Sequence, residues 1–274
     1  MTAGFGLIII GDEILSGKRA DKHLPKVIEL LAARGLALAY AEYVGDDPAR
    51  ITATLERVFS AARTSGDIVF STGGIGATPD DHTRQCAAKA LGAELALHPE
   101  ARILIEKRMR ELAKEQGTVY DPDAHDNMHR LNMGVFPVGA AIIPNPYNKI
   151  PGFSCQAGQG AVHFVPGFPV MAWPMIEWVL DHHYPDRHQK SATLEKSVIV
   201  FGAMEASLTP LMLAIEAEHA GVKVFSLPSV DHAEFGRHIE LGVKGAPAAV
   251  NEAYPSLLTG LHQFDVKLGP ELVR

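Results

Sequence analysis

The sequence predicts an α/β protein in two parts: a three-layer α/β/α domain with a mainly parallel sheet over residues 1–186, and a smaller α+β domain over residues 190–274. In the first part, short apolar runs alternate with segments whose apolar residues recur every three or four positions, which is typical of parallel strands joined by helices. A polar stretch at 184–192 with an early proline predicts a linker. Beyond it the predicted order is strand, helix, strand, strand, helix, strand.

The first half of the chain predicts three pairs of a strand and a helix. The strands are expected at residues 7–10, 36–44 and 67–71. In the first helix Leu24, Val27, Ile28 and Leu31 share a face. Asp47-Pro48 begins the second helix, because aspartate caps helices and proline suits the first helical position. The third covers 83–91 and ends at Gly92. The loops after these strands therefore meet at one edge of the sheet, where open α/β sheets bind ligands.

The middle of the chain is less regular. Residues 99–116 predict a charged amphipathic helix, whereas 120–133 predict a loop. His125 and His129 lie four residues apart in that loop, but a zinc site needs several convergent ligands, so a histidine metal site is disfavoured. Short strands are expected at 141–143 and 162–165, and a helix follows Pro169 and ends near His183.

The second part predicts strands at 194–201, 222–227 and 238–243, a final short strand, and helices at 207–219 and 247–261. Pro255 falls inside the last helix, where it is expected to kink or split it. This part carries no glycine-rich loop beside clustered carboxylates, so no chemistry is assigned to it.

The composition limits the classes of function. Hydrophobic residues make up 47% and charged residues 21% of 274 residues, as in ordinary globular proteins, and the formal charge of −7 argues against a nucleic-acid or membrane surface. The 2 cysteines have no CxxC spacing, which favours free thiols in a reducing compartment. No basic segment precedes the first apolar run, and no run approaches the ~18 residues of a membrane span. A cytoplasmic protein is therefore expected.

A glycine-rich loop, FSTGGIGATPDDHT at residues 70–83, follows the third predicted strand. Successive glycines let the backbone turn tightly and expose N–H groups that hold phosphate. Two adjacent carboxylates, Asp80 and Asp81, would repel a bare phosphate, so a divalent cation such as Mg²⁺ is expected between them. The alternative is that one of these aspartates only caps the next helix. The loop matches neither GxGxxG nor the Walker pattern, which disfavours a dehydrogenase or P-loop hydrolase.

Two separated motifs, GDEILSG at 11–17 and TGGIGATPDD at 72–81, resemble the molybdopterin-binding domain family, and within it the branch of the competence/damage-inducible protein A. The resemblance covers residues 5–185, including DDPARI at 46–51. It implies a three-layer fold, a homo-oligomer (dimer or trimer), and a site for a pterin or nucleotide phosphate with a divalent metal. In this branch the implied activity is a nucleotide pyrophosphatase acting on ADP-ribose.

The resemblance makes Asp81 the essential acidic residue, helped by Asp80, and it also admits nucleotidyl transfer to molybdopterin. The metal is expected on Asp81, Asp80, Asp12 and Glu13. The ligand is expected on Thr72, Gly73, Gly74, Gly76, Thr78, Ser16, Asn145, Pro166 and Gly167.

Two departures from the family pattern are visible. Tyr147-Asn148-Lys149-Ile150-Pro151-Gly152 stands where relatives usually have Gly-Thr-Ala-Pro-Gly, so bulkier side chains reach that turn. Residues 190–274 resemble no part of the deamidase domain of many relatives, so no amidase activity is expected. Ser71 and Ser154 have no evident histidine and acid partners in the sequence.

Two functions stay open. One is a metal-dependent phosphoanhydride hydrolase or nucleotidyltransferase. The other is a non-catalytic module, linked to molybdenum cofactor biosynthesis, that binds a pterin or nucleotide. The partners expected are this small molecule and further copies of the chain, with no nucleic acid and no membrane. The helix at 170–180, with Met171, Trp173 and Trp178, offers apolar surface for assembly.

Overall fold

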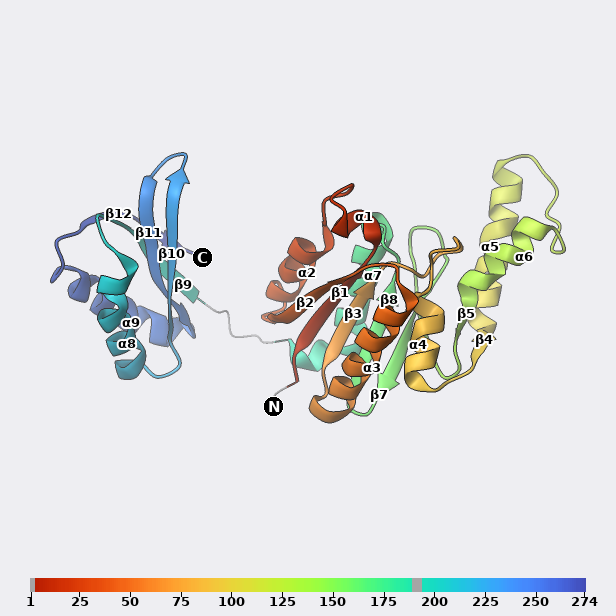
Figure 1. The fold of residues 1–274 in the computed structure, drawn as a ribbon, viewed down its shortest axis with the longest axis horizontal. Coiled ribbons are helices and arrows are strands. Elements are labelled where there is room, and N and C mark those ends of the chain that lie inside the picture. The colour runs from red at the N-terminus through yellow and green to blue at the C-terminus, as the bar shows by residue number, and fades with distance from the viewer. Residues whose placement is uncertain (1–2, 189–193) are drawn as a thin grey trace. The chain divides into compact units, whose positions relative to one another are not determined.

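The computed structural model describes residues 3–188 and 194–274 (Figure 1). The chain separates into two compact units, Met1–His188 and Gln189–Arg274, and each has its own core. Of the predicted linker at 184–192, Pro185–Arg187 forms a short 3-10 turn, η2, and residues 189–192 lie outside the described residues. No helix in the described ranges is long and apolar enough to cross a bilayer.

The first unit is built on a mainly parallel six-stranded sheet in the order β2-β1-β3-β8-β7-β6, which confirms the predicted fold class. Strands β1 (Phe5–Ile10), β2 (Leu38–Val44), β3 (Ile68–Thr72) and β8 (Gly160–Val165) run parallel to one another. Strand β7 (Gly152–Ala157) pairs antiparallel with both β8 and β6 (Ala141–Ile143), so β6 again runs in the direction of β8. Strand β7 was not predicted. Its sequence, GFSCQA, mixes polar and apolar residues, so no apolar run marks it.

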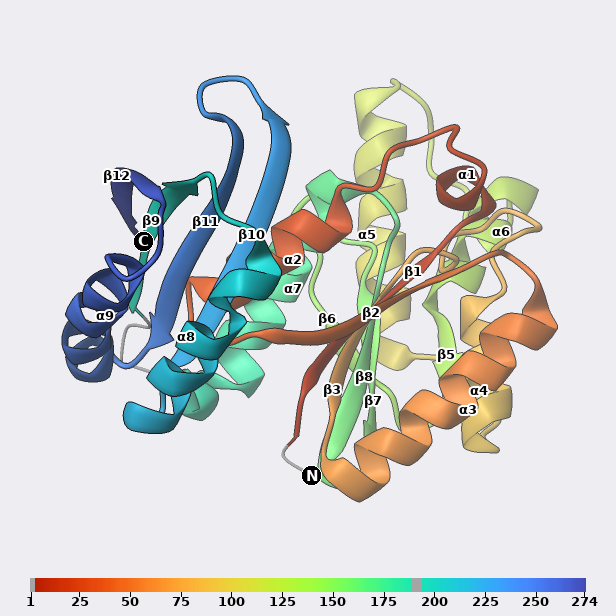
Figure 2. The same cartoon turned by 60° about the vertical axis from the view of Figure 1, so that its left-hand side comes forward.

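Helices cover both faces of this sheet, as the three-layer prediction requires (Figure 2). Helices α3 (Pro48–Ser65) and α4 (Thr83–Leu91) pack on one face, where Phe59 meets Phe164 of the sheet. Helices α2 (His23–Ala32) and α7 (Pro169–His183) pack on the other through Val27 and Ile176. The Asp47 side chain caps α3 by accepting a hydrogen bond from the Arg50 N–H at 2.8 Å. Ile28, predicted on the buried face of α2, is 48% exposed.

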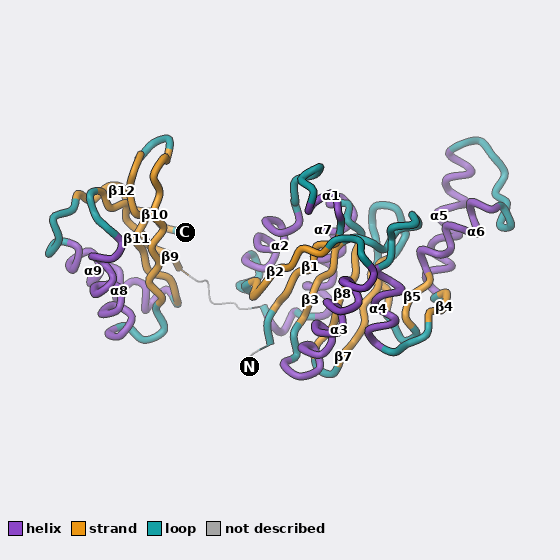
Figure 3. Tube along the Cα trace, viewed as in Figure 1, coloured by secondary structure: helices purple, strands orange, loops and turns teal. Residues whose placement is uncertain are grey.

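A lobe of residues 95–137, called here the helical lobe, lies beside the sheet (Figure 3). It contains β4 (Leu95–Leu97), α5 (Pro99–Glu115), α6 (His125–Leu131), the 3-10 turn η1 (Asn132–Gly134) and β5 (Val135–Pro137). The prediction of a loop over 120–133 is therefore wrong. Helix α6 has no side-chain cap and buries no residue completely. Neither a capping signal nor a full apolar stripe therefore marks this helix in the sequence. Packing of Leu131 and Met133 against the core stabilises it instead.

The second unit is an antiparallel sheet in the order β10-β11-β9-β12 with two helices. Its elements are β9 (Leu194–Phe201), α8 (Glu205–Glu218), β10 (Lys223–His232), β11 (Gly236–Gly245), α9 (Pro247–Leu261) and β12 (Lys267–Val273). This order confirms the predicted split β-α-β-β-α-β unit. Pro255 does not split α9, because its ring lies on the exposed side and Tyr254 and Leu257 anchor the helix in the core.

Candidate functional site

A cavity of about 670 Å³ lies at the carboxyl edge of the parallel strands. Its walls come from the loops after β1, β3 and β8 and from the turn between β6 and β7. This is the edge at which the sequence predicts a ligand. The loop after β3 supplies Gly73, Gly74, Ile75, Gly76, Ala77, Thr78, Asp80 and Asp81 to the lining.

The glycines of this loop are required by its backbone. Gly73 and Gly74 have φ angles of 98° and 67°, in the left-handed region that glycine adopts most readily. A Cβ atom on Gly73 would lie 2.2 Å from the carbonyl oxygen of Ile10, and one on Gly74 would lie 2.1 Å from Thr83 Oγ1. The close approach of β1 and α4 therefore excludes any side chain at either position.

The carbonyl groups of the loop are held on the side of α4. The Thr83 N–H donates to Gly74 O at 3.0 Å, and its hydroxyl donates to Gly73 O at 3.1 Å. Arg84 Nη2 donates to Gly76 O at 2.7 Å. By contrast, the N–H groups of Gly74, Ile75, Gly76 and Ala77 make no hydrogen bond within the described ranges. Four consecutive unpaired N–H groups in a cavity wall form a ready site for an anion.

The second acidic residue of the loop has a structural contact. Asp81 Oδ2 accepts hydrogen bonds from the Thr78 N–H at 2.8 Å and from the Thr78 hydroxyl at 2.5 Å. Asp81 thus holds the turn at 78–81 in shape, and its Oδ1 makes no hydrogen bond in the described part of the chain. The side chain thus braces the loop, and Asp81 also belongs to the cavity lining.

Further carboxylates line the same cavity on the side of β1 and β2. Burial raises the pKa of Asp46, and the nearby negative charges of Asp12, Glu13 and Asp80 raise it further. The Asp12 N–H donates to Asp46 Oδ2 at 2.8 Å, and the Asp46 N–H donates to Asp12 Oδ1 at 3.2 Å. These reciprocal bonds fix Asp46, a residue that the sequence analysis did not select, at the cavity wall.

Most of the predicted site residues line this cavity. They are Glu13, Gly73, Gly74, Gly76, Thr78, Asp80, Asp81, Asn145, Pro166 and Gly167. Three others do not: Asp12, Ser16 and Thr72. Thr72 is the last residue of β3, 1% exposed, and its hydroxyl donates to Ile8 O at 3.4 Å. Asp12 is engaged with Asp46, and Ser16 caps the short helix α1 (Asp12–Leu15) through its N–H.

Besides Asp46, two kinds of cavity residue were not predicted from the sequence. Lys18 and Arg19 are the two residues that directly follow the GDEILSG motif, and their proximity to it was an available signal. The apolar residues Met133, Ile150, Phe168 and Met171 also line the cavity. They come from segments without a regular pattern or from a helix start, so only the tertiary fold brings them together.

The carboxylates do not form a complete metal site by themselves. Among the residues that the structure describes, no three or more His, Cys, Asp or Glu side chains are grouped to hold a metal ion. Mg²⁺ characteristically binds one or two protein carboxylates together with phosphate oxygens and water. Of Glu13, Asp46, Asp80 and Asp81, at most two could therefore share one cation in the described part of the chain, and phosphate oxygens and water would have to supply its other ligands.

Ser154 has a histidine partner, contrary to its isolation in the sequence. Its Oγ lies 2.7 Å from His163 Nδ1, and His163 Nε2 lies 2.7 Å from the Tyr184 hydroxyl. Ser154 and His163 are 3% and 0% exposed, so no substrate reaches them. The third group is a tyrosine hydroxyl rather than a carboxylate. This chain of polar groups is therefore a satisfied part of the core.

Comparison with known proteins identifies the family. Residues 6–186 match the model of a probable molybdopterin binding domain. The chain belongs to the molybdopterin-binding domain family. This confirms the resemblance of its two motifs.

Relatives of this molybdopterin-binding domain include CinA-like proteins. One from Anaeromyxobacter dehalogenans is 33% identical over 177 residues, which are 64% of this chain and 40% of that protein. A protein from Pyrobaculum arsenaticum is 31% identical over 213 residues, or 77% of this chain and 75% of that one. The chain spans 40% to 50% of the CinA-like relatives from Anaeromyxobacter and Geobacter.

A solved structure supports the fold. The protein CinA of unknown function from Thermoplasma acidophilum has a TM-score of 0.54 and 24% identity, covering 66% of this chain and 97% of that one. This likeness shows that the molybdopterin-binding domain here has the three-layer arrangement of that protein.

Proposed function

We propose that the protein binds a pterin or nucleotide phosphate together with a divalent cation in the cavity beyond β3, and that it hydrolyses a phosphoanhydride bond of an ADP-ribose-like nucleotide. The observation that carries this proposal is that, among the described residues, the N–H groups of Gly74 to Ala77 make no hydrogen bond, and that these residues share the cavity lining with Asp80 and Asp81. The N–H groups favour phosphate, and the carboxylates favour a cation that accompanies it.

Each part of the cavity has a role in this proposal. The N–H groups of the loop bind phosphate oxygens, and Lys18 and Arg19 offset the charge of a second phosphate. A cation on the carboxylates would supply Lewis-acid neutralisation of the phosphate charge. Asp81 Oδ1 takes a proton from the attacking water. Water adds to one phosphorus, the P–O–P bridge breaks, and two phosphate monoesters leave.

The apolar wall suits the other end of such a ligand. The cavity lining also contains apolar side chains, those of Met133, Ile150, Phe168 and Met171. A heteroaromatic ring of a pterin or purine gains from contact with such side chains, since aromatic and sulfur-containing groups pack well on π faces. Inorganic pyrophosphate has no ring, so it is expected to bind more weakly than ADP-ribose.

The direct test is an incubation of the full chain with ADP-ribose and Mg²⁺ or Co²⁺, followed by separation of the products. We expect AMP and ribose 5-phosphate in equal amounts, and no product when the metal is chelated. A parallel incubation with molybdopterin and ATP tests nucleotidyl transfer. No turnover in any of these reactions contradicts the enzymatic proposal.

The same cavity also suits a non-catalytic module that binds the ligand in molybdenum cofactor biosynthesis. The incomplete donor set of the carboxylates in the described part of the chain favours this second candidate, because a weakly held cation can help a phosphate bind without activating a water molecule for attack. A ligand that raises the melting temperature and is recovered unaltered would support binding alone.

We further propose a homo-oligomer. The helix α7 buries Met175 and Ile176 against the sheet, whereas Val170 is 53% exposed and Phe168, just before the helix, is 57% exposed. The apolar surface that these two exposed side chains form at the start of α7 is proposed to contact a second copy of the chain. Light scattering at micromolar concentration is expected to give a dimer or trimer, and a monomer contradicts this.

A further inference from the structure

Arg84 joins the glycine loop to the helical lobe. It lies in the first turn of α4, is 5% exposed, and is the one permanently charged side chain among the buried residues of the described ranges. Its Nη2 donates to Gly76 O, and its Nη1 donates to Asn132 O in η1 of the lobe. A buried charge is costly unless it is paired and hydrogen-bonded. Here the partners are one carbonyl from each segment, with the Asp81 carboxylate nearby.

His129 makes a second connection from the lobe to the same loop. It lies on α6, and its Nε2 is 2.9 Å from Ala77 O. A carbonyl oxygen only accepts, so Nε2 carries the proton and donates. Gly76 O and Ala77 O, two successive carbonyls of the loop, are therefore both held by Arg84 and the lobe. Holding these carbonyls fixes the two peptide planes that carry the N–H groups of Ala77, in the cavity wall, and of Thr78, which donates to Asp81.

Lys149 connects the opposite wall to the lobe. It lies in the turn between β6 and β7, and its φ of 64° is the one positive φ outside glycine in the described ranges. This conformation is unfavourable for lysine, so the surroundings must hold it. Its Nζ pairs with the Glu111 carboxylate on α5 of the lobe, and its N–H donates to Asn145 O at 3.0 Å. The same turn carries Asn148 and Ile150 into the cavity lining.

We propose that the helical lobe is a positioning element that holds both walls of the cavity, with Arg84 and His129 setting the glycine loop and the Glu111–Lys149 pair setting the turn at 145–151. The site it positions is that of the proposed function. The lobe makes three contacts with the two walls: η1 through Arg84, α6 through His129 and α5 through Glu111. Met133 of the lobe also lines the cavity. The lobe thus determines the distance between the phosphate-binding loop and the wall that carries Asn148 and Ile150.

The test compares His129→Leu, Glu111→Gln and Arg84→Lys in the full chain. Glu106→Gln is the matched control, because Glu106 also lies on α5 and pairs with Arg102 and Arg110 but contacts neither wall. The first measurement is amide hydrogen exchange without ligand. The second is the affinity for ADP-ribose with Mg²⁺. His129 and Glu111 are not buried, so their variants are expected to fold even if Arg84→Lys does not.

We expect exchange to rise about tenfold in peptides over 77–83 for His129→Leu and over 145–151 for Glu111→Gln, with β3 and β8 unchanged. ADP-ribose affinity should fall about tenfold in both, with little change in melting temperature. The control should match the wild type throughout. Wild-type exchange in both segments overturns the proposal, whether or not ADP-ribose binds. A wild type that binds no ADP-ribose contradicts the proposed function instead.

Discussion

Asp81 combines a structural contact with a proposed chemical role, and one substitution separates the two. In Asp81→Asn the amide oxygen can still accept from the Thr78 N–H, so the melting temperature should change little. The negative charge is lost, so metal-dependent turnover of ADP-ribose should fall at least ~100-fold. Asp80→Asn is the comparison variant and should lose less turnover, because the family motif makes Asp81 the essential acidic residue. Equal turnover in Asp81→Asn and wild type would leave Asp81 with the bracing role alone.

The buried His163 predicts a pH dependence of stability. Burial lowers its pKa from 6.5 to about 3, so the folded protein keeps it neutral while the unfolded chain protonates it below 6.5. The unfolded state therefore binds more protons between these values, and the free energy of unfolding decreases as the pH falls through this window. The maximum slope from one such group is about 1.4 kcal/mol per pH unit.

His163→Gln removes this titration and keeps a polar group between Ser154 and Tyr184. Urea unfolding at several pH values from 7 to 4 is expected to show a steeper loss of stability in the wild type than in the variant. If the free energy of unfolding falls equally with pH in the wild type and the variant, His163 has the same protonation state in the folded and the unfolded protein. The variant itself should be less stable at pH 7, because a buried hydrogen bond is disturbed.

Some of the individual site residues could be predicted from the sequence, and others could not. Gly73 and Gly74 were predicted because a left-handed backbone needs glycine, and that requirement appears in the sequence itself. Lys18 and Asp46 were not predicted, because the local sequence does not show in which direction a charged side chain in a loop points. The pairing of Ser154 with His163 depends on the register of β7 and β8. No local pattern encodes that register.

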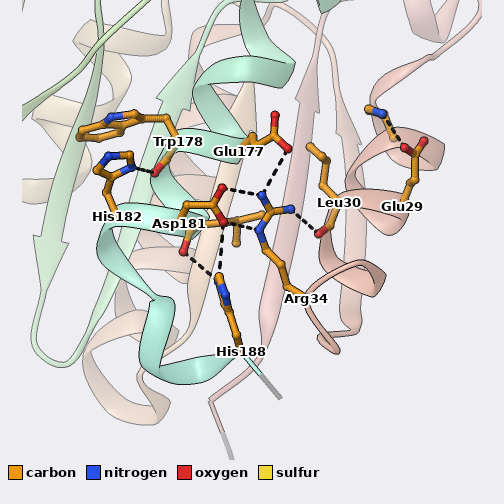
Figure 4. A network of polar contacts seen from close by, with 10 residues as sticks. Glu29, Leu30, Arg34, Glu177, Trp178, Asp181, His182 and His188 are labelled. Atoms are coloured by element: carbon orange, nitrogen blue, oxygen red, sulfur yellow. Dashed lines mark hydrogen bonds and ion pairs between the residues drawn. The ribbon is translucent and has the colours of Figure 1, made fainter. Parts of the chain in front are cut away.

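At the scale of elements, an ion-pair network joins the two helices on one face of the sheet (Figure 4). Arg34, just after α2, donates to Asp181 Oδ1 at 2.5 Å and Oδ2 at 2.7 Å, and to Glu177 at 3.3 Å, both on α7. A third nitrogen donates to Leu30 O at 2.9 Å. The two-point contact with Asp181 is the geometry in which arginine pairs are strongest.

Arg34→Met should lower the free energy of unfolding by about 1 kcal/mol at pH 7, because Asp181 is 43% exposed and solvent screens the pair. Arg57→Met, which breaks an exposed pair with Glu42, is the control and should lose less. The hydrogen bond from Arg34 lowers the pKa of Asp181, so the contribution is present above the unfolded pKa and is lost as the pH falls through the folded one. Equal losses in both variants at pH 7 would contradict this account.

Elements with strong periodicity were predicted well. Helix α3 has a capping aspartate, a first-turn proline and a buried stripe, and its predicted start agrees with the structure. Helix α6 and strand β7 were missed because tertiary packing, rather than their own pattern, holds them. The lobe and the turn that follows it therefore could not be assembled from the sequence, although they supply Met133, Asn148 and Ile150 to the cavity.

At the scale of the whole molecule, we expect the two units to have separate roles: the first binds the ligand, and the second contributes to stability or assembly. The cavity is lined entirely by residues of the first unit, and the second has its own core around Val198, Leu241 and Leu257. A chain ending at His188 should bind ADP-ribose within about twofold of the full chain, while losing stability or assembly. Loss of binding in a folded, normally assembled truncated protein would mean that the site extends into residues 194–274.

The cavity beyond β3 is proposed to hold a phosphate-bearing ligand together with a cation, and isothermal titration of the full chain with ADP-ribose, in Mg²⁺ and in EDTA, measures this binding. We expect saturable binding of one ligand per chain in Mg²⁺, weakened at least about tenfold in EDTA because the carboxylates then face the phosphate without a cation. Heats equal to those of buffer dilution in both solutions would contradict it.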